Sequence, residues 1–215
     1  IDRSPATKIQ PLGKVVRAPI VLTPQRRNRL LWTGEKLGRG ADYPLIMTLA
    51  HTGVREGELV SLNLINMVPI QTDTGWRYEL VVMGKGGKQR TIPIATVLEE
   101  VLVPYLLKRL DATGTDPQAP LFISARGTRY TTSAIQKKVK SYGKKSDIPG
   151  LHPHMLRHTF ATEAIEATGK DWKVVKELLG HASVKTTLDI YDHPSPERMQ
   201  RGVERTGECQ KEERT

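Results

Sequence analysis

The segment His154-Met155-Leu156-Arg157-His158 combines three side chains that suit phosphate chemistry. Spacings of three and four residues place His154, Arg157 and His158 near one face of a helix. An arginine offers a planar fork of hydrogen-bond donors, and a histidine can also move protons near neutral pH. Taken alone, the segment is equally compatible with an exposed polar face of a helix.

Three further side chains suit the same chemistry, although each also has an ordinary structural explanation. Arg55 lies in the segment 51–59, where it would also serve as a salt-bridged helix residue. His181 follows Leu178-Leu179-Gly180, a helix end with a glycine stop, where a histidine is usually structural or solvated. Tyr191 lies ten positions later on an apolar stripe, and such tyrosines more often belong to the core.

A basic turn lies between two runs of β-type residues. The runs cover 78–83 and 89–94, and the turn between them is Gly84-Lys85-Gly86-Gly87-Lys88. This pattern predicts a hairpin with a basic tip. Turns that combine glycine and lysine are also common in proteins simply because they are soluble, without any role in binding or catalysis.

These features occur in an order that closely resembles the tyrosine recombinase (phage-type integrase) family. The resemblance spans roughly residues 22–193 and is carried by four segments: HTGVREGEL, MGKGGKQRTIPI, HPHMLRHTFAT and LLGHASVKTTLDIYDH. The spacing of ten positions from His181 to Tyr191 is similar to that in integrases of conjugative transposons and temperate phages. Many chromosome-dimer resolvases of the family have a spacing one residue shorter.

The resemblance implies a site-specific recombinase that cuts and rejoins DNA through a covalent 3′-phosphotyrosine intermediate. In such a site two arginines bind the scissile phosphate, and the matching residues are Arg55 and Arg157. A lysine, here Lys85, protonates the leaving 5′ oxygen, and a tyrosine, here Tyr191, is the nucleophile. Two histidines, here His154 and His181, contact the phosphate and help to move protons. Glu58 matches the acidic residue that supports this site. Lys88 is the alternative to Lys85 as the lysine that protonates the leaving oxygen.

This chemistry depends on positive charge, and we predict neither a metal site nor a cofactor. A phosphodiester gains negative charge as it reacts, and two permanently charged guanidiniums stabilise that charge. A tyrosine of ordinary pKa, about 10, is ionised in about one molecule in a thousand at pH 7, so it needs a basic neighbour or a positive field. The phosphotyrosine conserves the phosphoester bond, so rejoining needs no ATP, and the sequence lacks an acidic cluster of the kind that holds Mg²⁺.

A surplus of basic residues favours a polyanionic partner. The 215 residues include 33 Lys+Arg and 23 Asp+Glu, which gives a formal net charge of +10. Cations near phosphates release condensed counterions, so double-stranded DNA is the predicted partner. A membrane partner is not expected, because no signal peptide opens the chain and no apolar run approaches the roughly 20 residues that span a bilayer. The single cysteine, Cys209, is typical of a protein in the reducing cytoplasm. With DNA as the predicted partner, we expect a cytoplasmic protein associated with the nucleoid.

One lysine-rich helix is the predicted DNA contact surface. The stretch 133–146 holds five lysines and no acidic residue, which is unusual for a merely solvated helix face. With the hairpin tip, the predicted DNA-binding residues are Lys88, Lys137, Lys138, Lys140, Lys144 and Lys145.

Hydrophobic periodicity predicts an α+β fold that is mostly helical and contains a small antiparallel sheet. Thr23-Pro24 is typical of an N-cap and a first helical residue, and predicts a helix to about Leu37. Further helices are predicted over 43–52, 54–62, 97–109, 131–145, 154–167, 171–179 and 183–192. We expect a basic linker or arm over 1–20, a catalytic domain over 21–193, and over 194–215 a charged tail that docks on a neighbouring subunit.

Three other functions remain open at this point. A relaxing enzyme similar to type IB topoisomerases would share the covalent chemistry but act as a monomer, whereas the family resemblance implies a tetramer on two DNA sites. A DNA-binding protein without catalysis is disfavoured, because all six positions are filled. A metal-dependent nuclease is disfavoured further. The resemblance also implies an N-terminal DNA-clamping domain in the natural protein.

Overall fold

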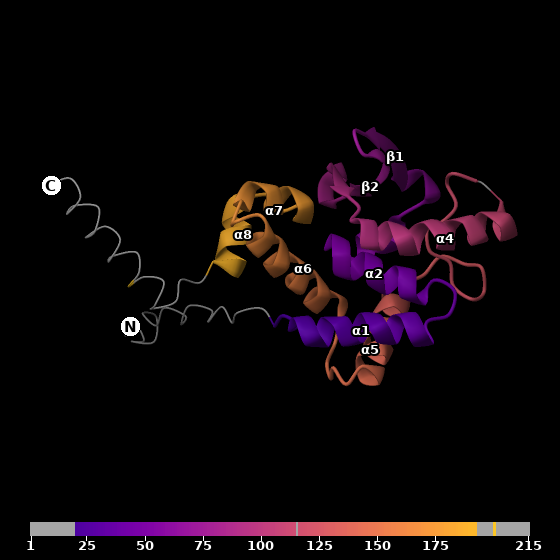
Figure 1. The fold of residues 1–215 in the computed structure, drawn as a ribbon, viewed down its shortest axis with the longest axis horizontal. Helices are drawn as coiled ribbons and strands as arrows, with labels where there is room; N and C mark the ends of the chain where they lie inside the picture. Colours follow the sequence, from indigo (N-terminus) through magenta and orange to yellow (C-terminus); the bar gives the residue numbers. More distant parts are fainter. Residues whose placement is uncertain (1–19, 115, 193–199, 201–215) are drawn as a thin grey trace, which may run out of the picture.

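The computed structural model describes residues 20–114, 116–192 and 200. Within them the predicted α+β fold, mostly helical with one small antiparallel sheet, is confirmed (Figure 1). The predicted linker and tail lie outside the described residues, except for Ile20 and Gln200, and the domain boundaries remain predictions.

The helices are α1 (Pro24–Leu37), α2 (Asp42–Thr52), α3 (Glu56–Ser61), α4 (Thr96–Thr113), α5 (Thr132–Lys145), α6 (Pro153–Ala167), α7 (Trp172–Leu179) and α8 (Val184–Tyr191). The strands are β1 (Met67–Thr72), β2 (Gly75–Met83) and β3 (Gln89–Pro93), with short 3₁₀ turns at η2 (Leu64–Asn66) and η3 (Lys85–Gly87).

Local sequence signals set the start of α1 as predicted. The Thr23 side chain accepts a hydrogen bond from the Arg26 backbone, and Pro24 occupies the first helical position, where a missing N–H is harmless. Just before the helix, the Leu22 backbone N–H donates to the Thr159 hydroxyl of α6 at 2.8 Å. This hydrogen bond fixes the start of the described chain to α6, the helix that carries His154 and Arg157.

The sheet has the order β1-β2-β3, and both pairs are antiparallel. Leu80 of the central strand pairs with Met67 on one side and Ile92 on the other, and all three side chains are buried. The predicted hairpin is thus β2 and β3, and η3 forms its basic tip.

Strand β1 is a strand that the sequence analysis did not predict. Its six residues include Pro69, which lacks a backbone donor and disfavours strand assignment from sequence. The structure resolves this conflict by placing β1 at the edge of the sheet, where only one side of the strand needs partners.

Helix α2 forms the centre of the main hydrophobic core. Its residues from Pro44 to Ala50 are all buried, and it packs against α1, α4 and α6. Figure 1 shows α2 between α1 and α4, with the sheet beyond α4. Among the described residues, no helix combines the length and the apolarity needed to cross a membrane.

A second, smaller hydrophobic cluster joins α6, α7 and α8. Its buried members are Ala161, Ile165, Val175 and Leu179, and the partly buried rings of Phe160, Trp172 and Tyr191 pack against them. Figure 1 shows α7 and α8 together beside α6, and α7 also packs against β3 of the sheet. Arg157 and Gly53 lie where this cluster meets the main core, and the candidate site is built there.

Candidate active site

The turn from α2 into α3 fixes Arg55. Gly53 ends α2 in the left-handed conformation (φ 62°), and a β-carbon there would lie 2.4 Å from the Phe160 ring. Two residues later Arg55 begins α3, and its backbone N–H and its guanidinium each donate to the Glu58 carboxylate at 2.8 Å. The Arg55 side chain remains 38% exposed, so it can also meet a ligand.

Glu58 is held by a second arginine that the sequence analysis did not single out. Arg90 of β3 donates to both carboxylate oxygens, at 3.0 and 2.8 Å, and to the Leu178 carbonyl of α7 at 3.0 Å. Burial opposes ionisation of Glu58, but hydrogen bonds from Arg90 and Arg55 outweigh it and lower the pKa of the carboxyl group. Arg90 lies two residues before the buried Ile92 on the inward face of β3, and an inward arginine requires a buried acid.

Helix α6 begins at the site and carries Arg157 inward. Its N-cap is His152, whose ring accepts from the Met155 backbone at 3.3 Å, and Pro153 follows at the first position. Arg157 is only 4% exposed and donates to the carbonyls of Gly53 and Leu179, the latter at 2.7 Å. Burial, and then the Arg55 charge, lower its pKa to about 10, so its guanidinium remains charged at neutral pH.

Arg55, His154 and Arg157 line one open pocket of 380 Å³. Glu58 and Met83 line it too, and His154 is exposed to solvent. Two guanidiniums and an imidazole thus surround a space that suits an anion such as a phosphodiester. The structure therefore brings together three of the six predicted catalytic residues and the predicted supporting acid.

His181 lies just after α7, close to the same charges. Gly180 ends the helix at φ 63°, and a β-carbon there would lie 2.7 Å from Arg90 Nη1. The His181 ring nitrogen Nδ1 lies 2.9 Å from the hydroxyl of the buried Thr187. Burial, followed by the charges of Arg157, Arg55 and Arg90, lowers the His181 pKa to about 4, so the ring is neutral at pH 7.

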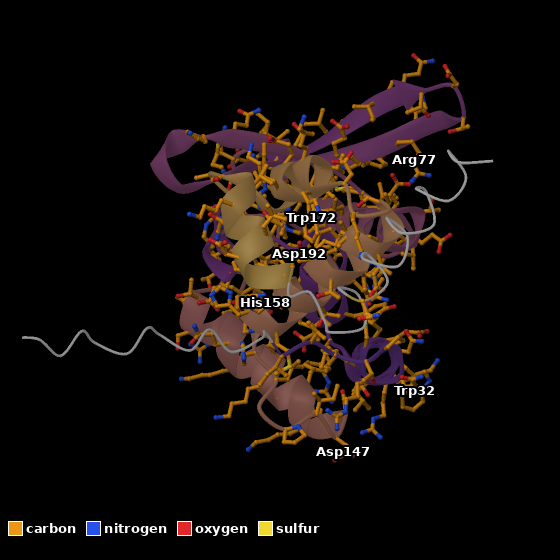
Figure 2. All side chains as sticks on the ribbon, turned by 90° about the vertical axis from the view of Figure 1, so that its left-hand side faces the viewer. Trp32, Arg77, Asp147, His158, Trp172 and Asp192 are labelled. Carbon is orange, nitrogen blue, oxygen red and sulfur yellow. The ribbon has the colours of Figure 1, made fainter. Side chains whose placement is uncertain are left out.

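Tyr191 is the last residue of α8, and its ring packs on the second hydrophobic cluster. Its hydroxyl lies 2.7 Å from Nδ1 of His158, and the two rings meet edge to face at 5.7 Å. Figure 2 shows His158 near Asp192, at the end of α8 that carries Tyr191. Burial raises the Tyr191 pKa to about 12, and the Arg157 charge only partly offsets this effect.

The predicted lysines occupy two regions. Lys85 begins the 3₁₀ turn at the hairpin tip, and Lys88 is exposed just after that turn. On α5, Lys137, Lys140 and Lys144 are exposed and share a face, since they are three and four residues apart. Lys138 instead forms an ion pair with Asp42, and Lys145 lies over the Tyr142 ring at 4.8 Å.

No group of three or more histidine, cysteine or acidic side chains is placed to hold a metal ion within residues 20–114 and 116–192.

The comparisons with known proteins agree with this geometry. The sequence matches the phage integrase family over residues 21–198. Tyrosine recombinase XerC of Pseudomonas entomophila (strain L48) is 34% identical over 194 residues, which cover 89% of this chain and 62% of that protein. XerC of Ralstonia pickettii (strain 12J) is 38% identical over 166 residues, covering 67% of this chain and 50% of the relative. The chain thus spans less than two thirds of the length of these relatives.

Solved structures show the same likeness. XerA recombinase superposes with a TM-score of 0.70 at 32% identity, covering 88% of this chain and 66% of that chain. The catalytic domain of bacteriophage HP1 integrase shares the fold with a TM-score of 0.58 at 24% identity, covering 86% of this chain and 94% of that one. The chain belongs to the phage integrase family, that of the tyrosine recombinases.

Proposed function

We propose that this chain is the catalytic part of a site-specific DNA recombinase or integrase. It would cut and rejoin DNA strands through a covalent bond between Tyr191 and a 3′ phosphate. The observation that carries the proposal is the pocket in which Arg55, His154 and Arg157 converge, because the residue next to Arg157 on α6, His158, contacts the hydroxyl of Tyr191. A neighbour of the same fold, XerH, has been solved bound to its difH substrate before and after cleavage.

The proposed reaction exchanges one phosphoester for another. Tyr191 Oη attacks the phosphorus, the bond from phosphorus to the 5′ oxygen breaks, and the tyrosine proton passes to a nearby histidine. Lys85 gives a proton to the departing 5′ oxygen, which leaves as a hydroxyl group. Rejoining reverses each step, so the bond count is unchanged and no ATP or metal ion is required.

The arginines carry most of the proposed electrostatic stabilisation. Arg157 is anchored to two backbone carbonyls and Arg55 to Glu58, so both are oriented before the phosphate arrives. Such prepositioned donors need no reorganisation as charge develops on the phosphate oxygens. Loss of one arginine is expected to slow cleavage on the order of 10³-fold, as in other phosphoryl transfers.

The geometry of α5 narrows the proposed DNA contacts. Lys140 lies beside His152 and His154 in a second open pocket, so the face that it shares with Lys137 and Lys144 continues from the first pocket. We infer that the duplex backbone follows this face. Lys138 and Lys145 have protein partners, and their DNA contacts remain predictions. Contacts of this kind set affinity rather than base sequence.

Assembly and location are also proposals. We infer a tetramer on two DNA sites in which the segment after Pro194 docks on a neighbouring subunit; apart from Gln200, that segment lies outside the described residues. A cytoplasmic, nucleoid-associated location follows only from the proposed DNA substrate. A role in mobile-element integration rests on the ten-residue spacing between His181 and Tyr191.

Covalent trapping tests the proposal directly. DNA duplexes with a randomised central segment carry a label at the 5′ end of one strand and a nick in that strand within the central segment. They are incubated with the chain in EDTA and resolved on a denaturing gel. When cleavage occurs just before the nick, the short fragment diffuses away and the covalent complex accumulates. We expect a labelled adduct that Tyr191→Phe abolishes and that Tyr105→Phe, which removes another half-buried phenol, leaves in place. DNA binding without any adduct would contradict the proposal.

Sequencing the trapped DNA would give the recognised site. Two duplexes that carry this site should then exchange strands. Relaxation of supercoiled DNA without exchange would instead identify a topoisomerase-like enzyme.

A further inference from the structure

The hydroxyl of Tyr191 is paired with a histidine outside the predicted six-residue site. Its hydrogen-bond partner is Nδ1 of His158, at 2.7 Å, across an interface between α6 and α8. We propose that His158 is the general base that accepts the Tyr191 proton during strand cleavage and returns it during rejoining. This inference rests on the proposed function and identifies the histidine that its mechanism requires.

The two groups have the protonation states that a base and its substrate need. Burial raises the Tyr191 pKa to about 12, so the tyrosine is the hydrogen-bond donor at neutral pH. Burial, and then the nearby His154, Arg157 and His152, lower the pKa of His158 from its ordinary value of 6.5, so its ring is neutral. A neutral imidazole has one bare nitrogen, and this geometry requires that nitrogen to be Nδ1.

The other two histidines are less suited to this step. His181 Nδ1 is paired with the Thr187 hydroxyl, and His154 is exposed on the pocket side, with its ring centre 6.1 Å from that of His158. Both would remain available for phosphate oxygens, and their roles there remain predictions. Of the histidines that the structure describes, only His158 directly contacts the oxygen that would attack phosphorus.

The surroundings of His158 delay proton transfer until a phosphate is bound. Arg157, His152 and His154 from its own helix region disfavour a charged His158 ring, and His181 and Tyr191 face it from the α7–α8 side. In the free protein the proton therefore stays on Tyr191. A bound phosphate adds negative charge beside Arg157, which makes the imidazolium easier to form.

Each proton and bond is accounted for in the proposed step. The Tyr191 O–H bond breaks and its proton binds His158 Nδ1 as the bond from Oη to phosphorus forms. The bond from phosphorus to the 5′ oxygen breaks, and Lys85 donates the proton that this oxygen takes. In rejoining, the 5′ hydroxyl attacks phosphorus, its proton returns to Lys85, and His158 returns its proton to Tyr191.

Single-turnover cleavage with two matched substrates tests the assignment. One duplex has the ordinary 5′ bridging oxygen at the trapped site, and the other has sulfur there, which leaves as a thiolate without a donated proton. We expect His158→Asn to slow cleavage of both substrates by about 10²–10⁴-fold, because asparagine fills the space but cannot take up a proton. Lys85→Ala should slow only the oxygen substrate, and Glu166→Gln, an exposed change on α6, should slow neither.

Two further readouts distinguish a base from a structural contact. The wild-type rate should fall as His158 becomes protonated below pH 6.5, and this acid limb should be reduced in His158→Asn. Added imidazole should partly restore cleavage by His158→Ala. Nitrogen NMR of the free chain should show Nδ1 of His158 without a proton.

The outcomes separate the two proposals. If the wild-type chain forms no adduct, the proposed function fails and the base assignment fails with it. His158 is not the base if the wild type cleaves and the folded His158→Asn variant cleaves equally fast. The same conclusion follows if the His158→Asn variant cleaves the sulfur substrate as fast as the wild type does. A proton on Nδ1 in the free chain would overturn the assignment whatever the kinetics.

Discussion

At the scale of single residues, the positive pocket depends on one buried carboxylate. Glu58 receives hydrogen bonds from Arg90, which also reaches the end of α7, and from Arg55, which faces the pocket. A buried charge is tolerated only when it is paired and hydrogen-bonded, and Glu58 meets both conditions. The orientation of Arg55 and the position of His181 thus share a common support.

Removing Arg90 should expose this dependence. Arg90→Ala is expected to lower the free energy of unfolding by about 3–5 kcal/mol, because it leaves the buried Glu58 carboxylate without its bidentate partner. Urea unfolding at pH 7 measures the change. The control is Arg29→Ala, which breaks the exposed ion pair with Asp147 and should cost less than about 1 kcal/mol. Similar losses in the two variants would contradict this account of Glu58.

Two half-buried histidines predict how stability depends on pH. Burial is the main reason why the pKa values of His51 and His181 are both lowered to about 4. Below the unfolded value of about 6.5 the unfolded chain takes up protons that the folded chain does not, so stability should fall from there towards pH 4. Either His51→Gln or His181→Gln should reduce this slope in urea titrations. A slope unchanged in both variants would show that neither ring is neutral at pH 5.

At the scale of helices and strands, two glycines determine how the second hydrophobic cluster meets the main core. Gly53 ends α2 against Phe160 and Leu179, and Gly180 ends α7 against Arg90. Both have positive φ values, and both are so close to their neighbours that a β-carbon would collide. The termini of α2 and α7 can therefore meet at Arg157.

Gly53→Ala should accordingly destabilise the fold by about 1–3 kcal/mol, because it overpacks the contact with Phe160 and strains the backbone. Gly57→Ala is the matched control, since its φ is not positive and the added methyl group would have no atom within 4 Å. In α3 that change should be neutral or stabilise by about 0.5–1 kcal/mol. Thermal unfolding of the two variants compares them, and an equal loss would contradict the packing argument.

The elements predicted from sequence were those with local signals. Thr23-Pro24, Gly53 and Gly180 mark helix ends within a few residues, and the structure places helix ends there. Strand β1 was missed because its partner β2 decides its conformation and Pro69 contradicts it locally. The pairing of Arg90 with Glu58 and of His158 with Tyr191 had no local signal either, because the partners lie 32 and 33 residues apart in the sequence.

At the scale of the whole molecule, charge is distributed unevenly around α5. Lys137, Lys140 and Lys144 form an exposed row that leads away from the pocket, whereas Lys138 and Lys145 are engaged with Asp42 and Tyr142. Because phosphate contacts release counterions, only lysines that touch DNA should contribute to the salt dependence of binding.

Lys140→Gln should weaken DNA binding and lower the slope of log affinity against log salt by about 1. Lys145→Gln removes the same charge from the same helix and should change the slope much less. Binding of a labelled duplex at several salt concentrations measures both. If Lys145→Gln had the larger effect, the duplex would lie along a different face of α5 from the one proposed.

The proline of β1 has a consequence for how copies of this chain can associate. Pro69 pairs with Tyr78, whose backbone N–H donates to Glu99 and whose carbonyl accepts from Ile94, so neither group is directed at β1. The missing donor of Pro69 therefore faces outward, where another strand would have to attach. An edge interrupted in this way is a poor template for sheet extension and amyloid-like polymerisation. If copies of this chain assemble on DNA as proposed, they would have little tendency to join through their β1 edges.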